Sequence, residues 1–377
     1  MAMTERERLL TVLSGKKPDR IPYAMDMSHY YLHRFQLPWD LCNGYAEPDK
    51  QMIDFHRSLG VGFYLANQAI FSKIEYTNGV KAGVYTDTCG GLPQIHWYYD
   101  TPLGAIERIR IWNPGSYSWA VKQWGVKTEK DLEIYGYAMS SRRYTAIPEN
   151  FDAWVDYIGE DGLLRMDGVG SSIGHLLNHW MGVENTIYAC YDWEDLLDEV
   201  NAKVDAALLE QLEIACGSFK NGEVVDMGDN FSSDVQSPKW LKRWSGDFYK
   251  KAHDIIHKHG KIVSEHIDGK LKGLIGTMRD LGADMIDAVT PGSVGGMTAA
   301  QAREEAGPDL ILCGGIPNEL WYEYAPMEKF EQAVKDWLAL KEISPALIMA
   351  AGDQVPPGAE ERKIVRMGEL VDEYGWY

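Results

Sequence analysis

Eight short apolar segments, separated by stretches with helical periodicity, constrain the fold of this chain more than any other feature. They cover residues 21–25, 61–66, 163–167, 224–228, 261–266, 285–289, 310–314 and 346–351. The intervening stretches place apolar side chains on one helix face, as they do between residues 271 and 281. Strands that alternate with helices in this number predict a parallel (β/α)8 barrel, also called a TIM barrel.

The segment from about residue 73 to residue 125 departs from this alternation. Turn signals at Asn78-Gly79 and Gly90-Gly91 separate short aromatic and β-branched runs. This pattern is typical of antiparallel β-hairpins, and we interpret it as an insertion after the second strand that could roof the barrel mouth. Residues 1–377 are therefore expected to form one barrel domain with this insertion.

The first residues predict a helix. Thr4-Glu5-Arg6-Glu7 has the form of a capping box, in which Thr4 accepts from the amide of Glu7 and Glu7 reaches back to Thr4. We expect the helix to begin there and to run to Gly15.

The charge and the apolar runs exclude several classes of partner. A formal net charge of -19 argues against binding to nucleic acid or to an anionic membrane, which the chain would repel. No apolar run approaches the roughly 20 residues of a membrane span, and the first residues contain no apolar stretch of signal-peptide length. We therefore expect a cytoplasmic protein. An odd number of scattered cysteines makes a disulfide framework unexpected: Cys42, Cys89, Cys190, Cys216 and Cys313.

Ionisable residues concentrate where the predicted strands end. Because barrel enzymes place their working groups at the carboxyl ends of the strands, we expect these side chains to converge at the mouth. They are Asp26, Asp167, Asp229, Glu265, His266, Asp268, Cys313 and Asp353.

Three of these residues could hold a metal ion. His266 and Asp268 are two residues apart at the end of one strand, and Cys313 ends a strand close by in the sequence. Imidazole, carboxylate and thiolate together suit Zn(II), which accepts nitrogen, oxygen and sulfur donors. Each residue alone has a structural explanation as well: a hydrogen-bonded histidine, a turn aspartate, and a buried cysteine. Asp229 similarly fits either a turn or a carboxylate that contacts substrate or handles a proton.

Several motifs resemble the uroporphyrinogen decarboxylase-like superfamily, and together they span nearly the whole chain. The resemblance implies a (β/α)8 barrel, in agreement with the strand count. The motifs are residues 6–15 with 18–22, residues 99–104, Gly228-Asp-Asn230 with Ser237-Pro238, and His266-Ile-Asp-Gly269.

The resemblance favours one branch of this superfamily. Its decarboxylases carry an arginine-rich segment soon after the opening, which holds the substrate carboxylates. The corresponding residues 23–31 contain no arginine, and the first one after them is Arg34. The chain therefore resembles the corrinoid-dependent zinc methyltransferases more closely.

In the thiol-methylating members of that branch, a His-x-Cys pair and a distal cysteine hold the zinc. His266 matches the histidine, but Asp268 stands in place of the paired cysteine, and Asp353 falls at the distal position before Pro356-Pro357. Oxygen and nitrogen donors leave a harder ion that favours an oxygen-containing substrate. We therefore hypothesise an O-demethylase, similar to aryl ether demethylases.

In this hypothesis zinc binds the ether oxygen of a methoxy compound while a Co(I) corrinoid takes the methyl group. His266, Asp268 and Cys313 are the expected zinc ligands, with Asp353 as an alternative, and Asp229 or Glu265 orients the substrate or donates a proton. A methoxyarene is the expected donor. No cobalamin-binding motif of the Asp-x-His-x-x-Gly kind is present, so the corrinoid is expected on a separate protein.

Other readings remain open. A methyl-corrinoid:thiol methyltransferase lacks its expected His-x-Cys here, and a metal-free decarboxylase or lyase would use Asp26 or Asp229. A binding protein without catalysis is a further alternative. The resemblance also leaves a homodimer open.

Overall fold

A parallel barrel forms the centre of the molecule. The computed structural model describes residues 2–37, 50–66 and 71–377. Within these ranges eight strands form one sheet, in which the spatial order of the strands follows the sequence. The last strand meets the first through a parallel bridge between Tyr23 and Met349, which closes the barrel and confirms the predicted (β/α)8 fold. The strands are β1 (Ala24–Met25), β2 (Gly62–Ala66), β9 (Gly162–Asp167), β10 (Val224–Met227), β11 (Ile262–His266), β12 (Met285–Val289), β13 (Ile311–Gly314) and β14 (Leu347–Met349).

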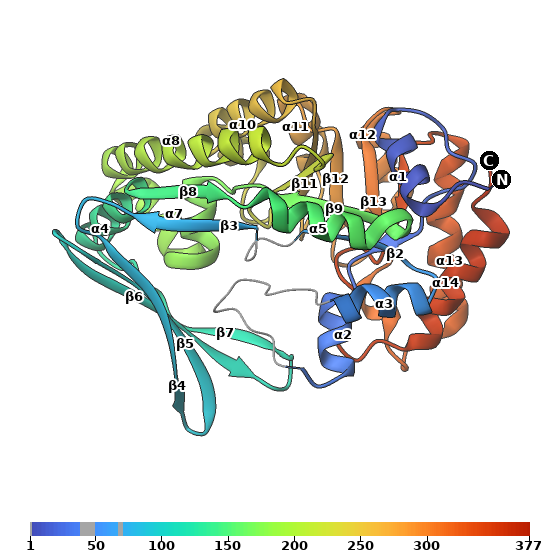
Figure 1. The fold of residues 1–377 in the computed structure, drawn as a ribbon, viewed down its shortest axis with the longest axis horizontal. Helices are drawn as coiled ribbons and strands as arrows, with labels where there is room; N and C mark the ends of the chain where they lie inside the picture. The colour runs from blue at the N-terminus through green and yellow to red at the C-terminus, as the bar shows by residue number, and fades with distance from the viewer. Residues whose placement is uncertain (1, 38–49, 67–70) are drawn as a thin grey trace.

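Helices surround this sheet (Figure 1). The helices before and within the insertion are α1 (Glu5–Leu13), α2 (Ser28–Arg34), α3 (Lys50–Ser58), α4 (Glu129–Ser140) and α5 (Pro148–Ile158). Those after β9 are α6 (Ser172–His175), α7 (Val183–Asp192), α8 (Glu194–Ser218), α9 (Pro238–Trp244), α10 (Gly246–Lys258), α11 (Leu274–Leu281), α12 (Ala299–Ala306), α13 (Met327–Leu338) and α14 (Glu361–Tyr374). Short turns are η1 (Gly159–Asp161), the π-helical η2 (Leu176–Trp180), η3 (Asn318–Trp321) and η4 (Ala339–Glu342).

The predicted capping box is present at the first helix. The Thr4 hydroxyl accepts from the Glu7 amide at 3.1 Å, and Glu7 accepts from the Thr4 amide at 2.8 Å. Helix α1 ends at Leu13, two residues before the predicted end, because Gly15 adopts a left-handed φ of 71° that terminates helices.

The insertion after β2 is antiparallel, as predicted, and extends beyond the predicted boundary. Strand β3 (Ser72–Tyr76) pairs with β8 (Arg142–Ala146), so the excursion continues past residue 125. A separate sheet contains β4 (Lys81–Cys89), β5 (Leu92–Thr101), β6 (Gly104–Asn113) and β7 (Ser118–Gln123). This second sheet projects away from the barrel in Figure 1.

Two further expectations can be compared with the described residues. Cys89, Cys190, Cys216 and Cys313 are free thiols, whereas Cys42 lies outside the described residues. Within the described ranges, no helix combines the length and the apolar character needed to span a membrane.

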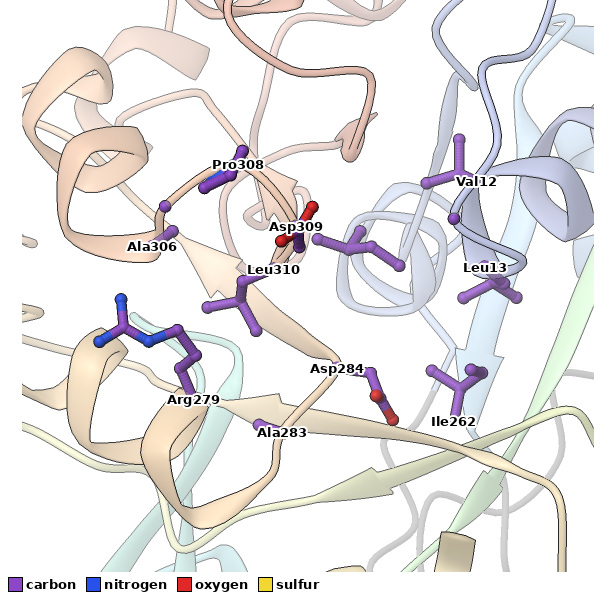
Figure 2. A pocket seen from close by; sticks show the side chains of 13 residues that line it. Val12, Leu13, Ile262, Arg279, Ala283, Asp284, Ala306, Pro308, Asp309 and Leu310 are labelled. Atoms are coloured by element: carbon purple, nitrogen blue, oxygen red, sulfur yellow. The ribbon is translucent and has the colours of Figure 1, made fainter.

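A cavity of about 540 Å³ opens at the amino-terminal ends of β11, β12 and β13 (Figure 2). Its lining includes Leu13 from the end of α1, together with Ile262, Asp284 and Leu310 at or next to these strand starts. It therefore lies at the end of the barrel opposite the predicted mouth. Because barrel enzymes bind and convert their substrates at the carboxyl ends of the strands, the active site is expected at that end of the barrel and not at this cavity.

Candidate active site

A layer of polar and charged side chains crosses the barrel interior. Arg165 on β9 donates from Nη1 to Asp226 Oδ1 on β10 at 2.8 Å and to Asp287 Oδ2 on β12 at 2.7 Å. Ser264 on β11 donates to the same Asp226 oxygen at 3.0 Å, and the Arg165 guanidinium lies 4.4 Å from the ring centroid of Tyr64. These five residues form what we call the interior layer.

One cation serves two carboxylates within this interior layer. Burial opposes ionisation of Asp287, yet the Arg165 guanidinium and His266 hold the pKa of that carboxyl well below its usual range. Burial raises the pKa of Asp226 to about 6, although Arg165 lowers it. Burial would also lower the pKa of Arg165, but the two carboxylates more than offset this and raise it. The guanidinium therefore stays charged and stabilises both buried carboxylates.

A local irregularity in β12 positions Asp287. The pairing of β12 with β13 shifts register between Ile286 and Val289, and Ala288 adopts a left-handed φ of 59°. Such backbone is unfavourable for a residue that carries a Cβ, and it persists where the surrounding structure enforces it. The bulge leaves the Asp287 carboxylate between Arg165 and His266.

His266 ends β11 and contacts carboxylates through both ring nitrogens. Its Nδ1 lies 3.4 Å from Asp287 Oδ2, and its Nε2 lies 3.9 Å from Asp353 Oδ1. Burial lowers the pKa of His266, but the hydrogen bond with Asp287 and the charges of Asp353 and Asp287 raise it to about 10. These surroundings therefore stabilise a positive charge at this position.

The backbone of β10 approaches His266 closely. A Cβ at Gly228 would lie 2.9 Å from the Cβ of His266, which real Cβ atoms do not tolerate. Gly228 also has a φ of 151°, a value that side chains disfavour. Only glycine at this position lets the imidazole stand against the end of β10.

Three loops bring carboxylates within electrostatic range of one another near the end of β11. Asp353 follows β14, Asp26 follows β1, and the Val355 amide donates to the Asp26 main-chain oxygen at 3.0 Å. Burial raises the pKa of Asp353 to about 7, with His266 opposing the rise and the carboxylates of Asp268 and Asp26 adding to it. His266, Asp353, Asp26 and Asp268 form what we call the mouth cluster.

Cys313 lies beside the interior layer. Its side chain is 1% exposed and hydrogen-bonds with Asp287. Burial and the nearby Asp287 carboxylate raise the pKa of the Cys313 thiol well above its ordinary value. The carboxylate that faces His266 Nε2 is that of Asp353, so the structure brings Asp353 closer to the predicted metal position than it brings Cys313.

Two of the remaining strand-end carboxylates, Glu265 and Asp229, hold helices in place. Glu265 precedes His266, so strand alternation turns it toward the helix layer, where its Oε1 lies 2.5 Å from His253 Nε2 on α10. Asp229 accepts from the Ser171 amide at 3.1 Å and from the Ser171 hydroxyl at 2.6 Å, next to the start of α6. The hydrogen bonds of these two side chains are thus made outside the mouth cluster.

The mouth cluster fits a divalent metal in donor chemistry and in charge. It offers one imidazole and several carboxylates, whose combined negative charge already favours a positive charge at His266. In the described part of the chain, no three His, Cys, Asp or Glu side chains meet the geometry of a metal site. The pair that converges is His266 with Asp353, and the carboxylates of Asp268 and Asp26 act electrostatically on Asp353.

Sequence reasoning missed the charged residues of the interior layer. Arg165, Asp226 and Asp287 lie within strands rather than at their ends. Their signal was a charged residue inside each of three largely apolar runs, as in Met285-Ile-Asp287-Ala-Val289. A charge in a buried strand needs a partner, so three such positions predict one another.

The family follows from the second half of the chain. Residues 175–374 match the family described as uroporphyrinogen decarboxylase (URO-D), which is more than half of the sequence. The chain belongs to this family. No curated protein sequence matches it.

One of the similar solved structures shows the same fold. A methyltransferase from Methanosarcina mazei matches over 99% of this chain and 99% of its own, with a TM-score of 0.60 and 14% identity. A xylose isomerase domain protein from Planctomyces limnophilus has a TM-score of 0.34 and 11% identity over 60% of this chain and 81% of its own. D-psicose 3-epimerase from Clostridium cellulolyticum H10 has a TM-score of 0.35 and 11% identity over 67% of this chain and 93% of its own.

Proposed function

We propose that this chain is a zinc-dependent methyltransferase that moves the methyl group of a methoxyarene to the Co(I) corrinoid of a separate protein. The observation that carries the proposal is the mouth cluster, where His266 Nε2 faces Asp353 with the Asp26 and Asp268 carboxylates close by. Membership of the URO-D family and the fold shared with the Methanosarcina mazei methyltransferase support it.

The side chains of the mouth cluster have distinct roles in this proposal. His266, Asp353 and Asp268 would hold the zinc ion, which supplies a Lewis acid when bound. Asp287 accepts from His266 Nδ1 and so keeps Nε2 directed at the mouth. Arg165 keeps Asp287 ionised for this task.

The reaction exchanges one bond of the methyl carbon for another. The bond from carbon to the ether oxygen breaks as a bond from carbon to cobalt forms. The electron pair of the new bond comes from Co(I), and the pair of the old bond leaves with the oxygen, which takes a proton from solvent. The mouth must therefore admit both the methoxyarene and the corrinoid of the partner protein.

Metal analysis of the purified protein is the first test. We expect about one zinc per chain in the wild type, and a loss of most of it in His266→Ala and in Asp353→Asn. The surface variants His257→Ala and Asp336→Asn remove the same kinds of group away from the mouth and should retain the metal. Wild-type protein that takes up no zinc would overturn the proposal.

The activity assay follows the absorbance change when a Co(I) corrinoid protein becomes methylated by a supplied methoxyarene. Methylation that depends on His266 is the expected result. Transfer from methylcobalamin to a thiol would instead support the thiol methyltransferase alternative. Release of CO2 from a porphyrinogen would support the decarboxylase alternative.

A further inference from the structure

The turn of the β6–β7 hairpin packs on helix α2 (Figure 1). His29 Nε2 donates to the Tyr117 main-chain oxygen at 2.9 Å. The Tyr117 hydroxyl donates to the Leu37 main-chain oxygen and lies 3.2 Å from that of Leu32. The His33 ring stands edge-on to the Tyr117 ring, with 5.0 Å between their centroids. One residue of the insertion thus contacts both α2 and the residues that follow it.

Helix α2 is attached to two segments of the mouth cluster. The amide of its first residue donates to Asp26 Oδ1 at 2.7 Å. His33 accepts at Nδ1 from the Gly358 amide at 3.2 Å, and Gly358 belongs to the loop that carries Asp353. Tyr117 therefore rests on the element that joins the loops of Asp26 and Asp353, so the hairpin turn lies at the mouth end of the barrel.

The base of the hairpin is held by the segment after β9. Arg108 Nη1 donates to the His179 main-chain oxygen at 3.1 Å. On the neighbouring strand β5, the Tyr99 ring stacks on that of Trp180, with 4.7 Å between their centroids. Tyr99 and Ile106 are both buried. The base is therefore packed against the rest of the protein.

The segment that holds the base also lies at the mouth end of the barrel. The Asn178 side chain donates to the Asp229 main-chain oxygen at 2.6 Å, and Asp229 lies just after the carboxyl end of β10. Since α2 follows β1, the hairpin bridges segments at the carboxyl ends of β10 and β1. Strands β2 and β9 lie between these two in the sheet, so the hairpin borders that side of the mouth.

Backbone irregularities mark both ends of the outer part of the hairpin. The pairing of β6 with β7 shifts register between Ile109 and Arg110, and a bulge of this kind bends a strand pair. Tyr117 adopts a left-handed φ of 50°, which is unfavourable for a residue with a Cβ and persists where contacts enforce it. Residues 113–116 between them are exposed. We call residues 111–120 the tip arm.

We propose that the tip arm is a lid, which closes one side of the mouth while Tyr117 rests on α2 and opens by bending at the bulge. Its contacts with α2 are made by one residue, whereas the base is buried, so the tip arm can separate from α2 while the base stays in place. Separation also releases the strained backbone of Tyr117. The inference rests on the proposed function for what the lid serves: closure holds the methoxyarene, and opening admits the corrinoid protein.

Labelling of a thiol in the mouth tests the lid without zinc or a methyl donor. Asp353→Cys places this thiol, and mass spectrometry follows its reaction with bulky fluorescein maleimide relative to small iodoacetamide. Adding Tyr117→Ala should raise this ratio about tenfold, because the lid loses a hydrogen bond and an aromatic contact. His29→Ala, which removes the other hydrogen bond, should act in the same direction. Tyr85→Ala is the matched control and should leave the ratio unchanged, because the Tyr85 hydroxyl donates to Glu107 within the same sheet.

Hydrogen exchange identifies which part of the hairpin moves. Amides of the tip arm should exchange about tenfold faster in Tyr117→Ala than in the wild type, while amides of residues 104–109 keep their rates. Faster exchange over the whole sheet would overturn a hinge at the bulge. An unchanged labelling ratio in a variant whose tip arm exchanges faster would overturn the closure of the mouth.

Locking the tip arm tests the need for opening. His33→Cys with Tyr117→Cys is joined by a short bismaleimide, and the locked protein should methylate the corrinoid protein at least about tenfold more slowly than without the reagent, because the open state is withdrawn. His33→Cys alone, treated in the same way, controls for modification of the native cysteines. Methylation by the locked protein at the unlocked rate would overturn the proposal. If the unlocked protein methylates no corrinoid, the proposed function fails, and labelling and exchange decide the lid.

Discussion

The interior layer and two arginines of the insertion carry their charges in opposite ways. In the interior layer, Arg165 bonds to both Asp226 and Asp287. Arg108 on β6 and Arg142 on β8 form no ion pair with a carboxylate in the described residues, and the Nε atoms of both are buried there without a hydrogen-bond partner. The first arrangement shares one cation between two carboxylates, whereas the second leaves its cations without an acidic partner.

This difference separates charges that hold the fold from charges whose removal should cost little. Removing a paired buried charge leaves its partners uncompensated, which destabilises the protein. Removing a cation that burial penalises and that no carboxylate pairs relieves desolvation instead.

Replacement of Arg165 should cause the largest loss of stability. Arg165→Met leaves Asp226 and Asp287 buried without their cation, so we expect the free energy of unfolding to fall by about 3–5 kcal/mol in urea titrations. Arg243→Gln, which breaks exposed ion pairs with Glu194 and Asp198, should cost less than about 1 kcal/mol. Equal effects of the two variants would mean that the interior layer is not held by charge.

Replacement of Asp287 should weaken zinc binding without removing a ligand. Asp287→Asn loses the negative charge next to His266 Nδ1, and such supporting groups typically contribute about 10-fold to 100-fold to metal affinity. Competition with a chelator measures the change. Asp284→Asn, whose partner is the surface residue His257, should leave the affinity unchanged. Wild-type affinity in Asp287→Asn would remove the link between the interior layer and the mouth cluster.

The pH dependence of stability should reveal Asp229, a buried carboxyl that accepts from the Ser171 amide and hydroxyl. Burial raises its pKa to about 7, although Ser171 lowers it. Because the folded state holds this proton more tightly than the unfolded state, the contribution is complete below about pH 4 and is lost as the pH rises through about 7. Asp229→Asn lacks this loss.

Urea titrations at about pH 5 and pH 8 measure this effect. The stability of Asp229→Asn relative to the wild type should rise between these pH values by roughly 1–3 kcal/mol, since one pKa unit corresponds to about 1.4 kcal/mol. Asp336→Asn, a surface control, should show no such change. A constant difference between Asp229→Asn and the wild type would contradict a raised pKa at this carboxyl.

Replacement of Arg108 should change stability least. Arg108→Gln loses contacts with Trp97 and Trp180 but also removes a buried charge without an acidic partner, so we expect a change below about 1 kcal/mol in urea. A loss as large as that of Arg165→Met would show that Arg108 holds the fold as Arg165 does.

Strand periodicity determined most of the fold. Seven of the eight strands begin and end within two residues of their predicted positions, and β1 begins three residues late, because a buried parallel strand requires a predominantly apolar run whatever its neighbours are. The turns also predicted the antiparallel insertion. They did not predict the pairing of β8 with β3, which joins residues about 70 positions apart. Pairing at that separation leaves no local pattern.

The candidate site was only partly determined by the sequence. The strand-end rule selected His266, Asp353, Asp26 and Asp268, because every parallel strand delivers its end to the same mouth. It also selected Glu265, which precedes His266 on β11. Because successive residues of a strand face opposite sides of the sheet, Glu265 points toward His253. Sequence alone did not indicate which of these side chains would meet.

Tertiary structure decided the contacts. Closure of the barrel between Tyr23 and Met349 brings Asp26 and Asp353 together from opposite ends of the chain, and the insertion gathers Arg108 and Arg142 around His175. The sequence by itself determined which residues end strands and which lie buried, since these follow from local periodicity. Which charges find partners depends on long-range packing. Contacts between distant segments give Arg165 two carboxylates, and they give Arg108 and Arg142 none among the described residues.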